Sequence, residues 1–147
     1  MMLDVALVGP GRFRKGEPAM AMQLMEGALY EASIDFAMAF FDTTYLLIPE
    51  HGLILPEGFC YPFSLTLLDL GPAQTFAWAR DIVASLLTLH PLTHLSIHIF
   101  ASRLYAWPID YYLQKEKLPY WDWNEPIAGL SYEERLCWFD VERYPYD

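Results

Sequence analysis

Three short segments of the chain combine residue types that could bind or transform a small molecule. In the first, residues 49–52, an apolar run is followed by a proline, Glu50, His51 and a glycine. An imidazole beside a carboxylate can serve as a general acid or base near neutral pH. The same residues would also suit a tight turn in which His51 caps backbone groups and Gly52 supplies a positive φ angle. The residue types alone leave both interpretations open.

The second segment, residues 101–105, follows an alternating polar and apolar run. Ser102 can cap a helix that begins after it, and Arg103 and Tyr105 can point into one cleft. A guanidinium in such a cleft would suit a phosphate or a carboxylate.

The third segment, residues 9–15, contains Gly9, Gly11 and Lys15. Its glycines would expose backbone N–H groups toward the next helix, which is a recurrent arrangement for binding anions. The spacing matches neither the P-loop nor the dinucleotide-binding fingerprint, and a simple strand-to-helix turn would account for it as well. Arg12 and Arg14 make this segment the only dense basic cluster, which could be a patch or a solvated loop.

Strands alternating with helices should position these segments. This order favours a small three-layer α/β/α fold with a mainly parallel sheet of about four strands, in a single domain of residues 1–147. Ligands of such sheets bind at the carboxyl ends of the strands, where all three segments lie. The predicted strands are 3–8, 43–48 and 94–101, with a short strand or buried loop at 65–70, and the predicted helices are 18–41, 73–89, 103–114 and one beginning at Ser131.

Composition excludes several classes of protein. A hydrophobic fraction of 54% is too high for a disordered chain. With 19 acidic and 9 basic residues the net charge is −10, so we expect no non-specific binding to duplex DNA. Cys60 and Cys137 are too few for a disulfide scaffold or a zinc site. His94 and His98 share a strand face without a third ligand nearby, so we expect no metal, and no resident cofactor is indicated. The chain shows no signal peptide or membrane span and is predicted to be cytoplasmic.

The succession of segments resembles a bacterial and phage family of unknown function. It is carried by "ALYEASIDFAMAFF", "EHGLILPEGFCYPFSLTL", "FAWARDIV", "IFASRLYAWPI" and "EPIAGLSYEERLCWF". Members of that family carry a Ser-Ala-Lys-His-Gly-Leu signature. More remotely, the chain is similar to the YaaA peroxide-stress proteins and to accessory domains of archaeal tRNA deazaguanine-modifying enzymes. The residues that match the family's pattern are Tyr30, Ser33, His51, Gly52, Tyr105 and Pro108.

The resemblance implies a cleft for a nucleotide, a nucleobase or a nucleic-acid end, with hydrolase- or transferase-like chemistry as one interpretation. His51, Glu50, Arg103 and Tyr105 would be its catalytic residues, and Gly9, Gly11 and Lys15 would bind the ligand. Glu50 stands where the family usually has lysine, which disfavours a phosphate there.

The other interpretation is a non-enzymatic acidic interaction protein of a mobile element or a stress response, for which a homodimer is an open arrangement. Trp107, Trp121 and Trp123 would be its anchors if exposed, or would close the core if buried. The sequence leaves open whether the protein is an enzyme.

Overall fold

The protein is built around one five-stranded sheet. The computed structural model describes residues 2–13, 16–63 and 66–143. The strands lie in the order β6-β5-β1-β8-β9; neighbours run parallel except β6, which is antiparallel to β5. The parallel α/β fold class predicted from the sequence is confirmed. The strand bounds are β1 Met2–Val8, β5 Thr43–Ile48, β6 Gly52–Ile54, β8 His94–Phe100 and β9 Trp121–Asn124.

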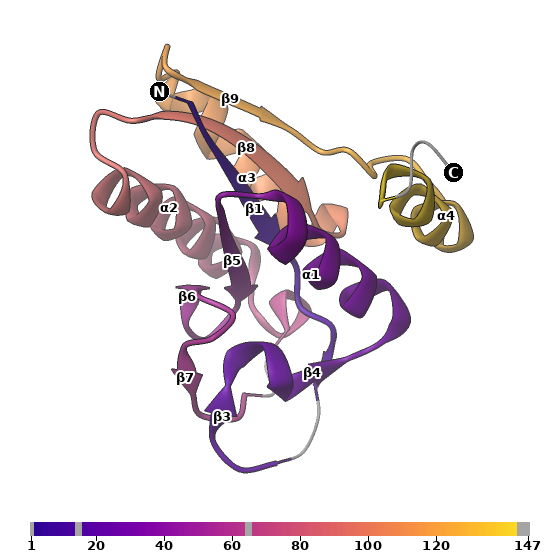
Figure 1. Cartoon of the computed structure of the whole chain (residues 1–147). Helices are drawn as coiled ribbons and strands as arrows, with labels where there is room; N and C mark the ends of the chain where they lie inside the picture. Colours follow the sequence, from indigo (N-terminus) through magenta and orange to yellow (C-terminus); the bar gives the residue numbers. More distant parts are fainter. Residues whose placement is uncertain (1, 14–15, 64–65, 144–147) are drawn as a thin grey trace.

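Helices cover both faces of the sheet. Figure 1 shows α1 in front of the strands, with α2 and α3 drawn fainter behind them. One hydrophobic cluster joins α2 and α3 to one sheet face, and a second joins α1 and α4 to the other. The helix bounds are α1 Ala28–Phe40, α2 Pro72–Leu89, α3 Arg103–Glu116 and α4 Tyr132–Arg143.

The central strand β1 shows why the sheet needs helices on both faces. Side chains alternate between faces along a strand. Val5 and Leu7 therefore belong to the cluster with α2 and α3, whereas Ala6 and Val8 belong to the cluster with α1 and α4. All four are fully buried, as expected for a parallel strand covered on both sides.

The connections of the sheet reverse direction at β1. From β1 the chain passes through α1 to β5 on one side, and then through α2 to β8 on the other side of β1. The carboxyl ends of β1 and β8 therefore flank a topological switch point. In open α/β sheets the crevice at such a point is the usual place for a ligand.

The helix predicted for residues 18–41 is wrong in its first part, because α1 begins only at Ala28. Residues before it form short strands and a 3-10 turn, and Gly27 has a φ of 126° that a right-handed helix does not accept. Pairing between short strands outweighs helix propensity in this region, because strand β3 pairs with strand β7 and strand β2 pairs with strand β4. The bounds are β2 Arg12–Phe13, β3 Ala19–Met20, η1 Ala21–Leu24, β4 Met25–Glu26 and β7 Phe59–Cys60.

Three further features of the fold are local. The segment 65–70 was expected as a short strand or a buried loop, and its described part forms the 3-10 turn η2, Leu67–Asp69, with a capping box between Thr66 and Asp69. Pro108 lies inside α3 without ending it; the carbonyl that would have accepted its missing N–H belongs to exposed Leu104. The aromatic-rich segment 118–129, expected as a loop, contains strand β9. None of the described helices is both long and apolar enough to cross a membrane.

Candidate functional site

A hollow of about 460 Å³ opens at the switch point. Its floor comes from the residues that follow β1, including Gly9 and Gly11, and from the end of β8, including Ser102. The amino-terminal turn of α1 and the start of α4 form its sides. This volume lies within the range of about 300–1,000 Å³ that small-molecule pockets usually have. We call it the switch-point hollow.

Gly9 and Gly11 of the hollow allow the backbone to pack closely against neighbouring residues. A Cβ atom on Gly9 would lie 2.8 Å from the Cβ of Ala101, and one on Gly11 would lie 2.6 Å from the Cβ of Tyr30. The Gly9 N–H donates to the Phe100 carbonyl at 2.9 Å, and the Gly11 N–H donates to the Met25 Sδ at 3.3 Å. Both N–H groups are therefore engaged within the protein, unlike the exposed donors that the sequence suggested.

Two helices begin at the border of the hollow instead. Gly27, Ala28 and Leu29 at the start of α1 line it, as does Ser102 at the start of α3. Among the described residues, neither helix has a side-chain hydrogen bond capping its first turn; Ser102 stands at the N-cap position of α3, but its side chain does not form the capping bond that the sequence suggested. The first N–H groups of a helix lack intrahelical partners and carry partial positive charge, so they favour an anion.

Charged side chains reinforce the preference of the hollow for an anion. Arg12 forms an ion pair with Glu26 across the β2–β4 ribbon at 3.3 Å, and both line the hollow. Arg135 of α4 lines it as well, and its Nε donates to the Leu130 carbonyl at 3.1 Å. That bond orients the guanidinium while leaving its terminal nitrogens for another acceptor. The described lining thus carries two cations and one anion, in a chain of net charge −10.

Tyr30 and Ser33 line the hollow and support its wall. The Tyr30 hydroxyl donates to the Met22 carbonyl at 2.8 Å, and the Ser33 hydroxyl donates to the Leu29 carbonyl at 2.7 Å. Burial, followed by the charges of Asp35 and Glu31, raises the pKa of Tyr30 well above its ordinary value. The phenol is therefore a fixed hydrogen-bond donor that stays protonated at neutral pH.

Tyr105 lines the hollow, but its ring packs on the other side of the sheet. The ring meets Trp78 edge-on at 5.7 Å, and its hydroxyl accepts the Leu67 N–H at 3.4 Å. Burial raises the pKa of Tyr105, with a smaller opposing effect of the Leu67 hydrogen bond. These contacts make Tyr105 a link between α3 and η2.

The other sequence-predicted residues lie elsewhere. Glu50 and His51 line a hollow of about 450 Å³ beside α2, and Arg103 lines one of about 280 Å³ between α2 and α3. His51 stands in a turn in which its N–H donates to the Ile48 carbonyl at 3.2 Å and Gly52 has a φ of 75°. Lys15 and Arg14 lie outside the described residues. Of the predicted set, Gly9, Gly11 and Tyr105 therefore meet at the switch-point hollow.

Sequence reasoning missed the contribution of α4. Arg135 and Tyr132 reach the hollow from the last helix, far along the chain from the glycine segment. The start of that helix was predictable, because Ser131 and Glu134 form a reciprocal capping box: the Glu134 N–H donates to Ser131 Oγ and the Ser131 N–H to a Glu134 carboxylate oxygen. The packing of α4 against α1 carries no local sequence signal.

The described residues offer no metal site and two free thiols. Within residues 2–13, 16–63 and 66–143, no three His, Cys, Asp or Glu side chains come together as a metal site would require. Both cysteines are free thiols, Cys60 buried and Cys137 exposed. Burial, followed by the charge of Glu50, raises the pKa of Cys60 and disfavours its thiolate.

Comparisons with known proteins were made for the whole chain. The comparison with curated proteins gave no significant match, and neither did the comparison with solved structures. A family model matches residues 5–141, which include every described residue that lines the switch-point hollow. The chain therefore belongs to the family of unknown function DUF6884.

Proposed function

We propose that this protein binds a nucleotide or a related phosphate-bearing small molecule in the switch-point hollow. One observation carries the proposal: two helix amino termini without side-chain caps, those of α1 and α3, border a single hollow at the reversal of strand order. Convergent N–H groups and dipoles are the usual backbone cradle for a phosphate. The topology places that cradle where open α/β sheets bind ligands.

The side chains around the cradle support a ligand with two chemically different ends. Arg135 provides a guanidinium whose fork geometry suits phosphate oxygens. Tyr132, which is 53% exposed, lies on the same helix and also lines the hollow. A flat base can stack on such a ring, a contact worth about 1–3 kcal/mol per base. The phosphate would lie against the helix termini and the base against α4.

Hydrolase- or transferase-like chemistry at this hollow would need an acid or base close to the ligand. The sequence suggested His51 with Glu50, yet these residues line the separate hollow beside α2. We therefore propose a binding function as the primary one, with Arg135, Tyr132, Ser102 and the α1 terminus as its residues. Gly9 and Gly11 hold the strands and helices close enough to form it.

Calorimetric titration tests this proposal directly. Nucleoside, nucleoside monophosphate and inorganic phosphate would be compared on the wild-type chain and on Arg135→Gln, at about 0.15 M salt so that distant charges are screened. We expect the monophosphate to bind more tightly than the nucleoside, and Arg135→Gln to weaken it about tenfold, as for loss of a charged hydrogen bond.

Two control variants locate the effect. Arg80→Gln removes the same charge from the outer face of α2, where Arg80 is paired with Asp81 at 3.6 Å, and should leave the affinity unchanged. Glu50→Lys should also have little effect if the ligand sits at the switch point. A gain in affinity with Glu50→Lys but no loss with Arg135→Gln would place the ligand beside His51. No phosphate-dependent heat in the wild type would overturn the proposed function.

A second function, self-association, is favoured by one exposed aromatic surface. Trp107 is 51% exposed on α3 and lies edge-on to Phe76 of α2 at 5.3 Å. Leu68, which is 79% exposed, and Leu104 line the adjacent hollow, whose described lining includes one charged residue, Arg103. Two copies of a chain with charge −10 repel least through such a nearly uncharged face. We propose it as the face of a homodimer.

The other tryptophans do not share this role. Trp121 is 4% exposed, and the Trp123 indole donates to an Asp110 carboxylate oxygen at 2.7 Å, so both close the core instead. Sedimentation equilibrium should give a dimer for the wild type and a monomer for Trp107→Ser. Tyr61→Ser, which removes another exposed aromatic residue, should remain dimeric. A monomeric wild type at high micromolar concentration would refute self-association.

A further inference from the structure

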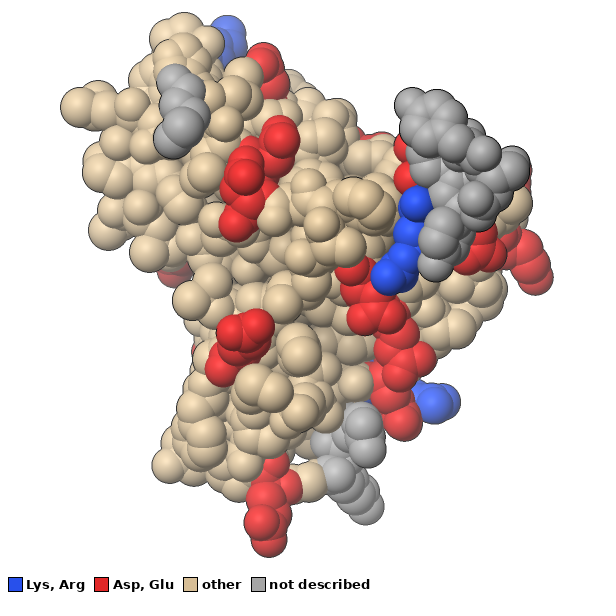
Figure 2. Space-filling model, viewed as in Figure 1, with Lys and Arg blue, Asp and Glu red and all other residues tan. Residues whose placement is uncertain are grey.

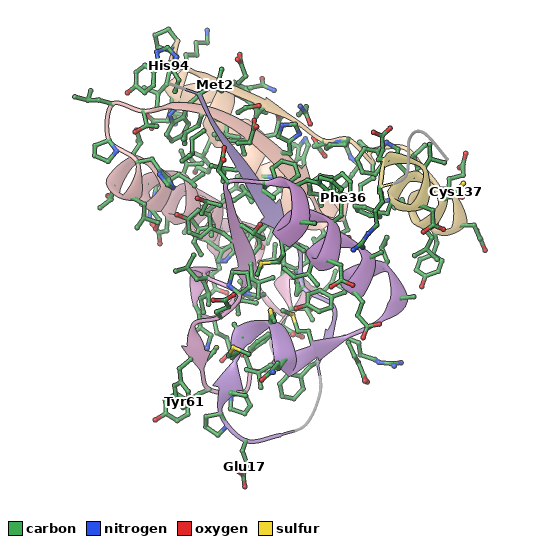
Figure 3. The ribbon with its side chains drawn as sticks, in the orientation of Figure 1. Met2, Glu17, Phe36, Tyr61, His94 and Cys137 are labelled. Carbon is green, nitrogen blue, oxygen red and sulfur yellow. The ribbon has the colours of Figure 1, made fainter. Side chains whose placement is uncertain are left out.

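A second hollow lies on the same side of the sheet as α1 and α4 but away from the switch point. Its volume is about 480 Å³, and it opens between the two helices over strands β1, β8 and β9. Figure 3 marks the helices that flank it at Phe36 and Cys137. The sequence proposed none of its residues for binding and disfavoured His98 as a metal ligand, and only Phe100 is shared with the switch-point hollow.

Aromatic rings form most of the apolar surface of this hollow. Phe36 and Phe100 are 8% and 2% exposed and form its base, with their ring centroids 5.9 Å apart. Phe40 is 54% exposed at the rim, while Phe41 and Trp138 are half-buried. Ring surface therefore remains available to a ligand, and the negative face of an aromatic ring attracts cations.

The charged groups of the hollow are all acidic. Asp4 of β1 and Glu142 of α4 line it, and no lysine or arginine is among its described residues. His98 also lines it, with Nε2 3.1 Å from the Ser96 hydroxyl oxygen. Burial lowers the pKa of His98, opposed by the charge of Asp4, so the imidazole is neutral at pH 7. Figure 2 shows acidic side chains spread over this face, with basic ones at few places.

We propose that this hollow binds a small organic cation with an alkylated ammonium group. Aromatic rings beside carboxylates are the chemistry that recognises quaternary and alkylated ammonium ions. An inorganic cation is not favoured, because no cluster of three metal-ligating side chains exists among the described residues. A phosphate is disfavoured by the two carboxylates. The site is therefore opposite in charge preference to the switch-point hollow, and it does not depend on the function proposed there.

Choline is a suitable probe, with 3,3-dimethyl-1-butanol as its neutral isostere. A nuclear magnetic resonance titration at millimolar ligand should shift the Trp138 indole N–H and the backbone amides of His98 and Asn124. The neutral isostere has the same shape without the charge, so it should cause much smaller shifts at the same positions. Equal shifts with both compounds would overturn the proposal, since the site would then recognise shape alone. An absence of choline shifts at these positions would overturn it as well.

Three variants separate the contributions of charge and ring. Glu142→Gln removes one carboxylate from the hollow, whereas Glu133→Gln makes the same change on an exposed part of α4 outside it. Phe40→Leu removes a ring that is already half exposed, so the fold should tolerate it. We expect Glu142→Gln and Phe40→Leu each to weaken choline binding about two- to fivefold, and Glu133→Gln to leave it unchanged. Equal affinity in all three variants would refute the assigned site.

Discussion

Replacing Gly11 by alanine should destabilise the fold, because the backbone of Gly11 lies against Tyr30. A Cβ atom on Gly11 would be 2.6 Å from both Cβ and Cγ of Tyr30 and 2.7 Å from the Glu26 carbonyl oxygen. Ordinary van der Waals contact begins at 3.4 Å, so something must move by about 0.8 Å. Tyr30 cannot easily yield, since it is 6% exposed and its hydroxyl is bonded to the Met22 carbonyl.

Overpacking of this kind costs about 1–3 kcal/mol in the free energy of unfolding. Urea denaturation followed by tryptophan fluorescence would measure it, with an unchanged denaturant slope as the sign that only stability has changed. Gly16→Ala is the matched control, because nothing lies within 4 Å of a Cβ atom there. It should be neutral or slightly stabilising. A Gly11→Ala variant as stable as the control would refute the argument that close packing requires glycine in this segment.

Three further outcomes are expected. Burial lowers the pKa values of His90 and His98, so unfolded chains bind more protons than folded ones just below pH 6.5. The free energy of unfolding should therefore fall as pH decreases through that region. In a His90→Gln, His98→Gln double variant, the urea concentration at the unfolding midpoint should depend less on pH. Hydrogen bonds from Ser131 lower the pKa of Glu134, so this cap stabilises α4 fully above the ordinary carboxylate pKa and is lost as pH falls through the lowered pKa of the folded state. Amide exchange in the first turn of α4 should accelerate over that pH range in the wild type and less so in Glu134→Gln. Exposed Cys137 should react rapidly with a thiol reagent while Cys60 reacts only on unfolding, and Cys137→Ser should abolish the rapid phase.

The layer architecture was predictable because its signals are local. The strand Thr43–Ile48 combines two β-branched threonines with the apolar run 45–48, and α2 begins one residue before the predicted start at Ala73. The region before α1 was not predictable, because its short strands are stabilised by partners such as Phe59 and Cys60 that lie far along the chain. The methionines there fit helical spacing, yet Met25 instead accepts the Gly11 N–H.

The candidate site was predictable only in part, for a related reason. The segments after β1 and β8 could be located because both strands end at recognisable glycine or serine positions, and the topology then places Gly9 and Ser102 together. His51 also follows a parallel strand, but β5 lies on the far side of β1 from β8. Strand order depends on contacts throughout the chain, so it cannot be predicted from any single segment of the sequence.

The central position of β1 has a consequence for how the chain acquires its structure. β1 precedes β8 in the chain and pairs with it along its whole length, so that Met2 faces His94 and Val8 faces Phe100. Contacts so distant in sequence form slowly, because a long loop must close before they can stabilise anything. Until the chain has been synthesised to residue 100, one edge of β1 lacks its partner strand. The apolar residues Val5 through Val8 can then pair with or pack against other chains. Nascent or carboxyl-terminally truncated chains should therefore be the forms of this protein most prone to aggregate or to engage chaperones.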